Sequence, residues 1–319
     1  MEIIKLKKYI YKDDKTRPKQ IVWDSSSLST FSACPRLYRL TNLSGYKLKR
    51  YAPVTGFGSA VHDGFETLDK CKFEKKTKQE AVTEAVTNII KKYGEDLNKS
   101  EDKARGLEAT VRAIVWRAEE FWEDNLKIAT MPNGAPCLEQ RFEVPFGTLG
   151  HRLSGRIDKI VELDNRLYLC DTKTTKTSLT DLYFRNFQPN NQIYAYLWVA
   201  RNVLDLDIVG FIVDAVQTGV HFCRFNRSVF TVPQANINEW YTDALYAVGL
   251  ADAYSENEYY PANFTSCGNY GGCKFREVCS TQPDHRQIIL EEDFKQELHK
   301  DLVVDNVIHA ENIFKRKET

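Results

Sequence analysis

The sequence contains no long hydrophobic run, although the chain has 319 residues. A membrane-spanning helix needs about 20 consecutive apolar residues, and no stretch of this chain approaches that length. The first 20 residues, MEIIKLKKYIYKDDKTRPKQ, are too charged and too interrupted for a secretory signal. We therefore expect a cytoplasmic protein that makes no contact with a membrane.

The chain also has no net charge, because its 44 Lys and Arg residues balance 44 Asp and Glu residues. Net charge alone therefore does not indicate a nucleic-acid partner. The basic residues are nevertheless uneven: residues 1–50 hold 12 Lys or Arg and only 4 Asp or Glu. This basic segment is either a surface that faces phosphate groups or a solvated arm without a partner.

Closely spaced cysteine pairs are also missing. Zinc ribbons usually pair cysteines two to four residues apart, whereas Cys267, Cys273 and Cys279 have five residues in each gap. Disulfides are disfavoured in a reducing compartment. Iron–sulfur clusters use four thiolates, and one of them can come from a distant segment. Cys34, in FSACPRLY, is the natural fourth member, although three unligated loop cysteines and a buried Cys34 remain an alternative.

The first half of the chain reads as helical. The serine cluster at 25–27 predicts a short helix that ends near Gly45. A glycine-rich loop at 55–60 then enters a helix in which His62 and Glu66 share a face, because they are four residues apart. Two further helices are predicted, at about 77–93 and 102–128.

The pattern changes after MPNGAPC, a turn rich in proline and glycine. We predict three strands, then a helix, two strands and a long helix, at 138–146, 151–163, 166–175, 187–203, 207–217, 219–227 and 234–255 respectively. Strands that alternate with helices in this order indicate an α/β or α+β core with a central mixed sheet.

The second and third predicted strands form a hairpin that carries unusual charges. Asp158 lies on the first strand, and Asp171 and Lys173 lie on the second, two residues apart and so on one face. Carboxylates suit magnesium, and manganese also accepts imidazole, so these acids and His62 are candidate metal ligands. A lysine beside a metal-bound phosphate stabilises developing negative charge. The alternative is a solvated hairpin without a function.

Four motifs follow one another along the chain: GSAVH at 58–62, LSGRID at 153–158, LCDTKTT at 169–175 and QIYAY at 192–196. In order and rough spacing they resemble the PD-(D/E)XK nuclease superfamily, specifically its RecB-like branch. Each motif alone is degenerate, but four in this order are not. The resemblance implies a restriction-endonuclease-like core, in which helices flank a central mixed β-sheet.

The resemblance also implies roles for individual residues. His62, Asp158 and Asp171 resemble the metal ligands, and Lys173 resembles the catalytic lysine. Gln192 and Tyr196 resemble the Gln-x-x-x-Tyr helix motif of the branch, although ordinary helix packing is an alternative for Tyr196. Glu139, at the start of an earlier strand, resembles a recurrent family glutamate.

The cysteines resemble the split set of iron–sulfur RecB-like nucleases, which include AddB-type subunits and CRISPR-associated RecB-like exonucleases. The resemblance implies a 4Fe-4S cluster held by Cys34, Cys267, Cys273 and Cys279. The first gap of the triplet is longer here than in those proteins, and Gly271 and Gly272 would let the longer loop fold tightly. We expect the cluster to be a structural staple.

We expect one nuclease domain between a basic arm and a charged tail. The arm is expected at 1–24, the domain at 25–285 and the tail at 286–319. Within the domain we expect a helical part at 25–130, a sheet core at 137–255 and a cysteine loop at 264–281.

The predicted function is a Mg²⁺- or Mn²⁺-dependent deoxyribonuclease, an exonuclease acting on single strands or duplex ends of DNA. Such an enzyme fits a microbial or phage-infected cell, with a helicase or recombination partner. The candidate DNA-binding residues are Arg36, Arg39, Lys47, Lys49 and Arg50. The alternative from another class is a non-catalytic iron–sulfur DNA-binding or assembly subunit that retains the nuclease fold.

Overall fold

The computed structural model describes residues 22–49, 55–131, 133–147 and 150–297. These residues form two compact units. The first unit contains the described residues of 1–52, 143–154 and 238–307, and the second unit contains those of 53–142 and 155–237. The basic arm at 1–24 lies almost wholly outside the described residues, and the predicted extent of a single domain over 25–285 stays a prediction.

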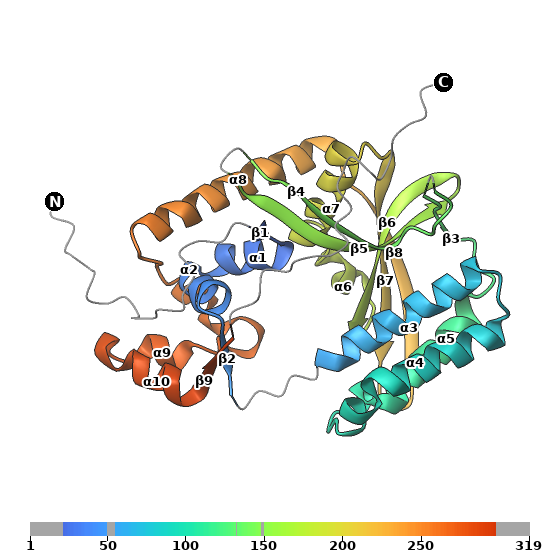
Figure 1. Cartoon of the computed structure of the whole chain (residues 1–319), viewed down its shortest axis with the longest axis horizontal. Helices are drawn as coiled ribbons and strands as arrows, with labels where there is room; N and C mark the ends of the chain where they lie inside the picture. Colours follow the sequence, from blue (N-terminus) through green and yellow to red (C-terminus); the bar gives the residue numbers. More distant parts are fainter. Residues whose placement is uncertain (1–21, 50–54, 132, 148–149, 298–319) are drawn as a thin grey trace. The chain divides into compact units, whose positions relative to one another are not determined.

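The centre of the second unit is a mixed sheet (Figure 1). Strand β5 (Arg152–Leu163) pairs antiparallel with β6 (Arg166–Thr175), which pairs parallel with β7 (Ile208–Thr218). Strand β8 (Cys223–Thr231) completes this order antiparallel to β7. All residues of β7 except Val209 are buried, as expected for a strand covered on both faces.

The hairpin between β5 and β6 turns at Asp164 and Asn165. Both residues have positive φ, +50° and +59°. Two-residue hairpin turns require this backbone conformation, and Asp and Asn tolerate it better than most residues. The turn therefore sets Leu163 opposite Arg166 and fixes the register of the hairpin.

Three further strands extend the sheet around β5. Strands β3 (Lys127–Ile128) and β4 (Leu138–Pro145) pair with β5. Strand β1 (Val22–Trp23) pairs parallel with the first two residues of β5, within the first unit. Among the described residues the sheet therefore has seven strands, and the predicted mixed sheet is confirmed.

Three long helices pack together in the second unit (Figure 1). They are α3 (Thr55–Phe73), α4 (Lys78–Asn98) and α5 (Leu107–Phe121). Thr77 and Glu80 form a reciprocal capping box that starts α4. The sequence predicted a loop at 55–60, but α3 already begins at Thr55. Gly56 and Gly58 lie in the first turns of this helix and do not interrupt it.

The predicted single helix near Cys34 is divided in the structure. Helix α1 (Ser25–Ala33) ends before Cys34, whose backbone is extended, and α2 (Pro35–Tyr38) begins at the proline. A proline is tolerated in the first turn of a helix, but it disfavours the helical conformation of the residue before it. A π-helix (Arg39–Leu43) follows α2.

The remaining elements are short, except for α8. In the second unit they are a 3-10 helix (Lys103–Arg105), α6 (Asp181–Arg185), α7 (Asn191–Trp198) and a π-helix (Val199–Val203). Helix α8 (Gln234–Glu256) begins in the second unit and continues in the first. The first unit also contains 3-10 helices (Phe264–Gly271 and Pro283–His285), α9 (Arg276–Ser280), α10 (Arg286–Asp293), and the paired strands β2 (Tyr46–Leu48) and β9 (Phe294–Gln296).

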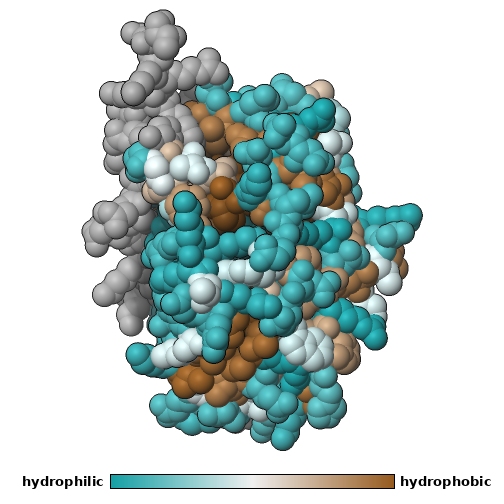
Figure 2. Space-filling model, turned by 90° about the vertical axis from the view of Figure 1, so that its right-hand side faces the viewer, coloured by the Kyte–Doolittle hydropathy of each residue, from teal (hydrophilic) through white to brown (hydrophobic). Residues whose placement is uncertain are grey.

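Hydrophilic residues predominate on the face drawn in Figure 2, and hydrophobic residues appear there in separate patches. None of the described helices is both long enough and apolar enough to span a membrane.

Candidate active site

The end of the hairpin is joined to helix α3 by one carboxylate. Asp158 Oδ2 on β5 accepts a hydrogen bond from the backbone N–H of Thr172 on β6 at 2.9 Å. The same oxygen lies 3.2 Å from Nδ1 of His62 on α3. His62 and Asp158, which are 96 positions apart in the sequence, therefore meet at this oxygen. Both residues and Thr172 belong to the second unit.

Asp171 and Lys173 lie on one face of β6 and are bridged by Gln192 of α7. Lys173 Nζ lies 2.6 Å from Asp171 Oδ2 and donates to Gln192 Oε1 at 2.7 Å. Gln192 Nε2 donates to Asp171 Oδ1 at 3.0 Å. A longer contact of 3.4 Å joins Gln192 Nε2 to the hydroxyl of Tyr196. The amide of Gln192 thus contacts both charged groups at once.

Local sequence explains why α7 presents Gln192 at this place. The predicted helix began at Phe187, but α7 begins at Asn191. The side chain of Asn190 caps the helix by accepting hydrogen bonds from the N–H groups of Gln192 and Ile193. Gln192 and Tyr196 are four residues apart and so lie on the same face.

The two aspartates have opposite electrostatic environments. Asp171 is 2 % exposed, and its burial, reinforced by the charge of Asp158, raises its pKa above the ordinary value. Burial also disfavours ionised Asp158, but the hydrogen bond and charge of His62 outweigh it and lower the pKa of Asp158. Burial therefore dominates at Asp171, whereas the neighbouring imidazole dominates at Asp158.

His62 responds to the same negative charge. Burial alone would lower the pKa of its imidazole. The hydrogen bond to Asp158, together with the charges of Asp158 and Asp171, outweighs burial and raises this pKa. The neighbouring carboxylates therefore favour the protonated form of the His62 imidazole, and Lys173 supplies a cation beside Asp171.

Two further acids lie near these residues. Burial, together with the charges of Asp158 and Glu66, raises the pKa of Glu139 on β4 to about 7, although the charge of Arg156 opposes the shift. Arg156 Nε lies 2.7 Å from Glu139 Oε2. Burial also raises the pKa of Glu66, which lies one helical turn after His62 on α3. The site therefore contains more acids than the hairpin alone supplies.

Sequence reasoning missed Arg156 and Tyr183. Arg156 lies two residues before Asp158 on β5, so strand alternation was a signal that could have identified it. Burial and the charge of Asp171 raise the pKa of the Tyr183 phenol on α6, so this residue lies near Asp171. The segment of Tyr183 carries no pattern that marks it.

Four cysteines approach one another in the first unit. Burial raises the pKa of the Cys273 thiol, and the thiols of Cys279, Cys267 and Cys34 raise it further. The backbone N–H of Cys273 donates to the carbonyl of Cys267 at 2.9 Å. All four are free and half-buried. The other four cysteines, Cys71, Cys137, Cys170 and Cys223, are buried.

Within the described ranges, no three His, Cys, Asp or Glu side chains are arranged so that they would hold a metal ion. At the hairpin, His62 lies 3.2 Å from Asp158 and Lys173 lies 2.6 Å from Asp171, so side chains of the protein already contact these carboxylate oxygens. The donor set itself, two carboxylates and an imidazole, fits a divalent metal such as Mn²⁺.

The candidate DNA-binding residues are spread over the first unit. Lys47 Nζ pairs with Glu297 at 2.9 Å, and Lys49 Nζ donates to the carbonyl of Glu291 at 2.6 Å. Arg39 is 8 % exposed and lies over the ring of Tyr260, so its guanidinium offers little surface to a phosphate. Arg36 is half-buried, and Arg50 lies outside the described residues.

A family model described as the PD-(D/E)XK nuclease superfamily matches residues 24–280. Since this match spans most of the chain, the protein belongs to the PD-(D/E)XK nuclease superfamily. The match and the mixed sheet flanked by helices confirm the predicted restriction-endonuclease-like fold. The RecB-like branch and the iron–sulfur cluster stay predictions.

No curated protein matches the sequence. A candidate exonuclease from Eubacterium rectale is 13 % identical, with 79 % of this chain and 86 % of that chain covered and a TM-score of 0.44. The solved structure of SSO0001 is 15 % identical, with 76 % and 84 % covered and a TM-score of 0.26. Both TM-scores are too low to support an argument about function, so the assignment rests on the family model.

Proposed function

We propose that the protein is a divalent-metal-dependent nuclease that hydrolyses phosphodiester bonds of DNA. The observation that carries the proposal is the set of contacts among Asp158, Asp171, Lys173 and Gln192, with His62 joined to Asp158. Phosphodiester hydrolysis needs acids that hold a metal and a cation beside the phosphate. This set contains both.

The residues that would hold Mg²⁺ or Mn²⁺ are His62, Asp158 and Asp171. A divalent cation supplies charge neutralisation at the phosphate and lowers the pKa of water. The fit rests on Asp171, whose burial beside Asp158 makes its charge costly even with Lys173 beside it. His62 and Lys173 must leave these oxygens when a metal binds.

Lys173 and Gln192 have distinct roles in this proposal. The ammonium of Lys173, released from Asp171, stabilises negative charge on the scissile phosphate or orients the attacking water. Gln192 accepts a hydrogen bond from Lys173 and donates one to Asp171, so it limits the motion of both groups. Tyr196 contacts the amide of Gln192 from the next helical turn.

The exonuclease mode, the branch of the superfamily, the biological process and the phosphate contacts also belong to this proposal. We infer an exonuclease of the RecB-like branch that acts on single strands or duplex ends, in a recombination or repair process with a helicase partner. These points rest on the motif resemblance. The phosphate contacts are assigned to Arg36, Lys47, Lys49 and Arg50, with Arg39 the weakest member because it is buried.

We further infer a 4Fe-4S cluster held by Cys34, Cys267, Cys273 and Cys279. The mutual influence of their thiols on the pKa of Cys273 supports it, because ionised thiolates repel one another and a cationic cluster would relieve that repulsion.

The test uses end-labelled single-stranded DNA, end-labelled duplex DNA and closed circular DNA, incubated with purified protein and Mn²⁺ or Mg²⁺. We expect metal-dependent degradation of linear DNA that Asp171→Ala and Lys173→Ala abolish. Lys99→Ala, which removes an exposed lysine at the end of α4, serves as the matched control and should retain activity.

Each result decides a separate point. Degradation that persists in both active-site variants would show that the site assignment is wrong. Cleavage of closed circles would contradict the exonuclease mode. DNA binding without any cleavage would favour the alternative, a non-catalytic DNA-binding or assembly subunit with the same fold.

A further inference from the structure

A cavity of ≈ 220 Å³ lies in the second unit, among the last turns of α3 and α5, strand β3 and the sheet. Apolar side chains, including Phe121 and Trp122, form part of its wall. Two carboxylates, Asp69 and Asp124, also line it. The cationic side chains that line it are more numerous: Lys72, Arg117, Lys127, Lys159 and Arg227.

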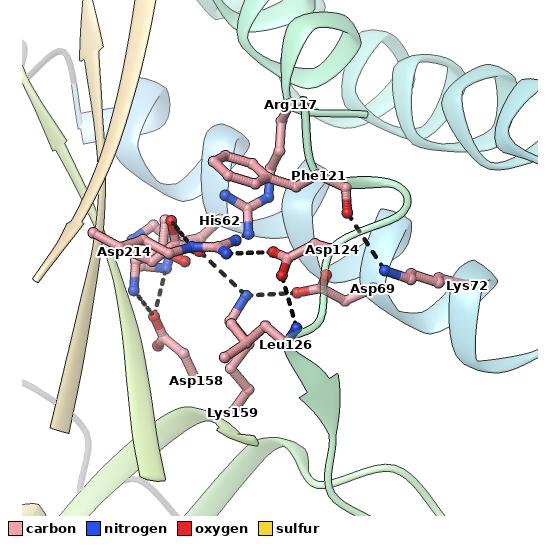
Figure 3. Close-up of polar contacts among 12 residues, drawn as sticks. His62, Asp69, Lys72, Arg117, Phe121, Asp124, Leu126, Asp158, Lys159 and Asp214 are labelled. Atoms are coloured by element: carbon pink, nitrogen blue, oxygen red, sulfur yellow. Dashed lines mark hydrogen bonds and ion pairs between the residues drawn. The ribbon is translucent and has the colours of Figure 1, made fainter. Parts of the chain in front are cut away.

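The inner charges of the cavity balance one another (Figure 3). Arg117 Nη2 donates to Asp214 Oδ2 at 2.6 Å, and Lys159 Nζ pairs with Asp69 at 2.7 Å. Arg227 pairs with both Asp124 and Asp214. Buried ions need such partners, because removal from water is costly. These three cations and three carboxylates therefore leave no net charge among themselves.

Two further lysines of the lining, Lys72 and Lys127, add positive charge. Lys72 Nζ donates only a long hydrogen bond, 3.4 Å, to the carbonyl of Phe121. Lys127 is exposed, and in the strand register it lies opposite Glu162. Neither lysine has an ion pair within 4 Å among the residues that the structure describes. The lining of the cavity therefore carries more cationic than anionic side chains.

The interior also holds a buried hydrogen-bond donor that has no acceptor. Arg117 is 4 % exposed and its Nη1 is buried without a hydrogen-bond partner. Its guanidinium lies over the ring of Phe65 at 4.3 Å, so aromatic packing supports the group but supplies no oxygen acceptor. Buried donors of this kind are rarely left without an acceptor.

We propose that this cavity binds a phosphate group, either as inorganic phosphate or as the phosphate of a mononucleotide. Lysine and arginine are the side chains that bind phosphate oxygens best. The cavity is smaller than the roughly 300–1,000 Å³ typical of drug-sized ligands, so it fits one compact anionic group and not a whole larger molecule.

Two elements that line the cavity, β5 and α3, also carry residues of the candidate active site. Lys159 follows Asp158 on β5, and Asp69 lies two helical turns after His62 on α3. A ligand in the cavity would therefore contact the two elements that carry Asp158 and His62. The proposal does not depend on nuclease activity, since its test measures binding alone.

The test is calorimetric titration of inorganic phosphate into the full-length protein at low ionic strength, without added divalent metal. We expect saturable binding. Lys72→Ala and Lys127→Ala should each weaken it about threefold, and the double variant about tenfold. Lys91→Ala removes an exposed lysine of α4 that does not line the cavity, and this control should bind as tightly as the wild type.

Further titrations identify the ligand and locate the site. Equal affinity for phosphate and thymidine monophosphate would mean that the protein recognises the phosphate group alone. Tighter binding of the nucleotide would mean that its sugar or base also contacts the protein. The proposal is overturned if phosphate does not bind, if the double variant binds it as tightly as the wild type, or if thymidine binds as tightly as its monophosphate. It is also overturned if Lys173→Ala removes binding, because phosphate would then lie at the hairpin.

Discussion

At the scale of single residues, the candidate site depends on side chains that serve two partners at once. Asp158 Oδ2 faces both the Thr172 N–H and His62, and the amide of Gln192 contacts both Lys173 and Asp171. An amide can do this because its oxygen accepts and its nitrogen donates. Loss of one such side chain therefore disturbs two groups.

Gln192→Ala should reduce turnover about ten- to a hundredfold, because it removes two hydrogen bonds to charged groups. Tyr196→Phe should cost less, since its contact with Gln192 is long, 3.4 Å. Steady-state kinetics on a labelled oligonucleotide measure both effects. Gln79→Ala, an exposed position on α4, is the control. A Gln192→Ala enzyme with wild-type turnover would contradict the bridging role.

The pair of His62 and Asp158 should make stability depend on pH in the metal-free protein. Folding raises the pKa of His62, so its contribution is complete below about 6.5 and is lost as pH rises through the folded pKa. Folding lowers the pKa of Asp158, so its contribution is complete above about 3.9 and is lost as pH falls through the folded pKa. The pair therefore stabilises most between about pH 4 and 6.5.

Urea denaturation of the wild type and His62→Ala measures this effect. The difference in free energy of unfolding should be larger at pH 5.5 than at pH 9, by about 1 kcal/mol. Any lost packing is the same at both pH values and cancels. A difference that does not change with pH would mean that the pair is not ionised as inferred. In an Asp158→Asn background the pH dependence should largely disappear.

At the scale of elements, α3 determines where His62 lies, and its packing depends on a glycine. A Cβ atom at Gly64 would lie 2.5 Å from Cδ1 of Ile114 on α5, and Ile114 is fully buried. Glycine is otherwise unfavourable in a helix by about 0.5–1 kcal/mol relative to alanine. Gly64 therefore allows α3 and α5 to approach closely, two residues from His62.

Gly64→Ala should destabilise the protein by about 1–3 kcal/mol, because overpacking outweighs the gain in helix propensity. Ile114→Val in the same chain should recover part of this loss by removing the methyl group in the way. Gly94→Ala in α4 is a matched control: its nearest contact would be an ordinary 3.6 Å, so we expect it to stabilise the protein. Thermal unfolding measures all three, and a stabilising Gly64→Ala would contradict the packing argument.

At the scale of the molecule, the first unit unites segments that are far apart in the sequence. Cys34 and Cys267 are 233 positions apart, yet the backbone N–H of Asn263 lies 3.3 Å from Cys34 Sγ. A cluster that joins these segments would restrict the unfolded chain, and the benefit of such a link grows slowly with loop length. The proposed 4Fe-4S group would therefore act mainly on stability.

Anaerobically purified protein should be brown, absorb near 400 nm and contain about four irons per chain. Cys279→Ser should lose this absorption and unfold at a lower temperature. Cys223→Ala removes a buried cysteine of the second unit, so it should keep the absorption even if it loses some stability. A colourless protein with stoichiometric zinc would overturn the cofactor proposal.

The strands and helices that carry strong periodicity were predictable from the sequence. Strand β6 has the predicted bounds, 166–175, because its alternating pattern ends at clear turn residues. The division of the first helix at Cys34 was missed, although Pro35 was a signal for it. The start of α3 at Thr55 was missed because glycines suggested a loop, and packing overrode that preference.

The residues of the candidate site that belong to the four motifs were predictable from the sequence. His62, Asp158, Asp171, Lys173 and Gln192 were named from motifs, and the structure brings them together. Tyr183 was not predictable, because its helix of five residues has no distinctive pattern. The buried pair of Arg117 and Asp214 was not predictable either, since its partners are 97 positions apart and each resembles an ordinary surface charge in the sequence.

The sequence by itself determined the class of this protein, because strand alternation, helix periodicity and the order of four motifs are local properties of the chain. Only the tertiary structure decided that Gln192 bridges Lys173 and Asp171, that Glu139 adjoins His62, and that Lys72 and Lys127 line a cavity. The physical reason is that hydrogen bonds, burial and Coulomb interactions depend on distances in space, and separation along the chain does not determine those distances.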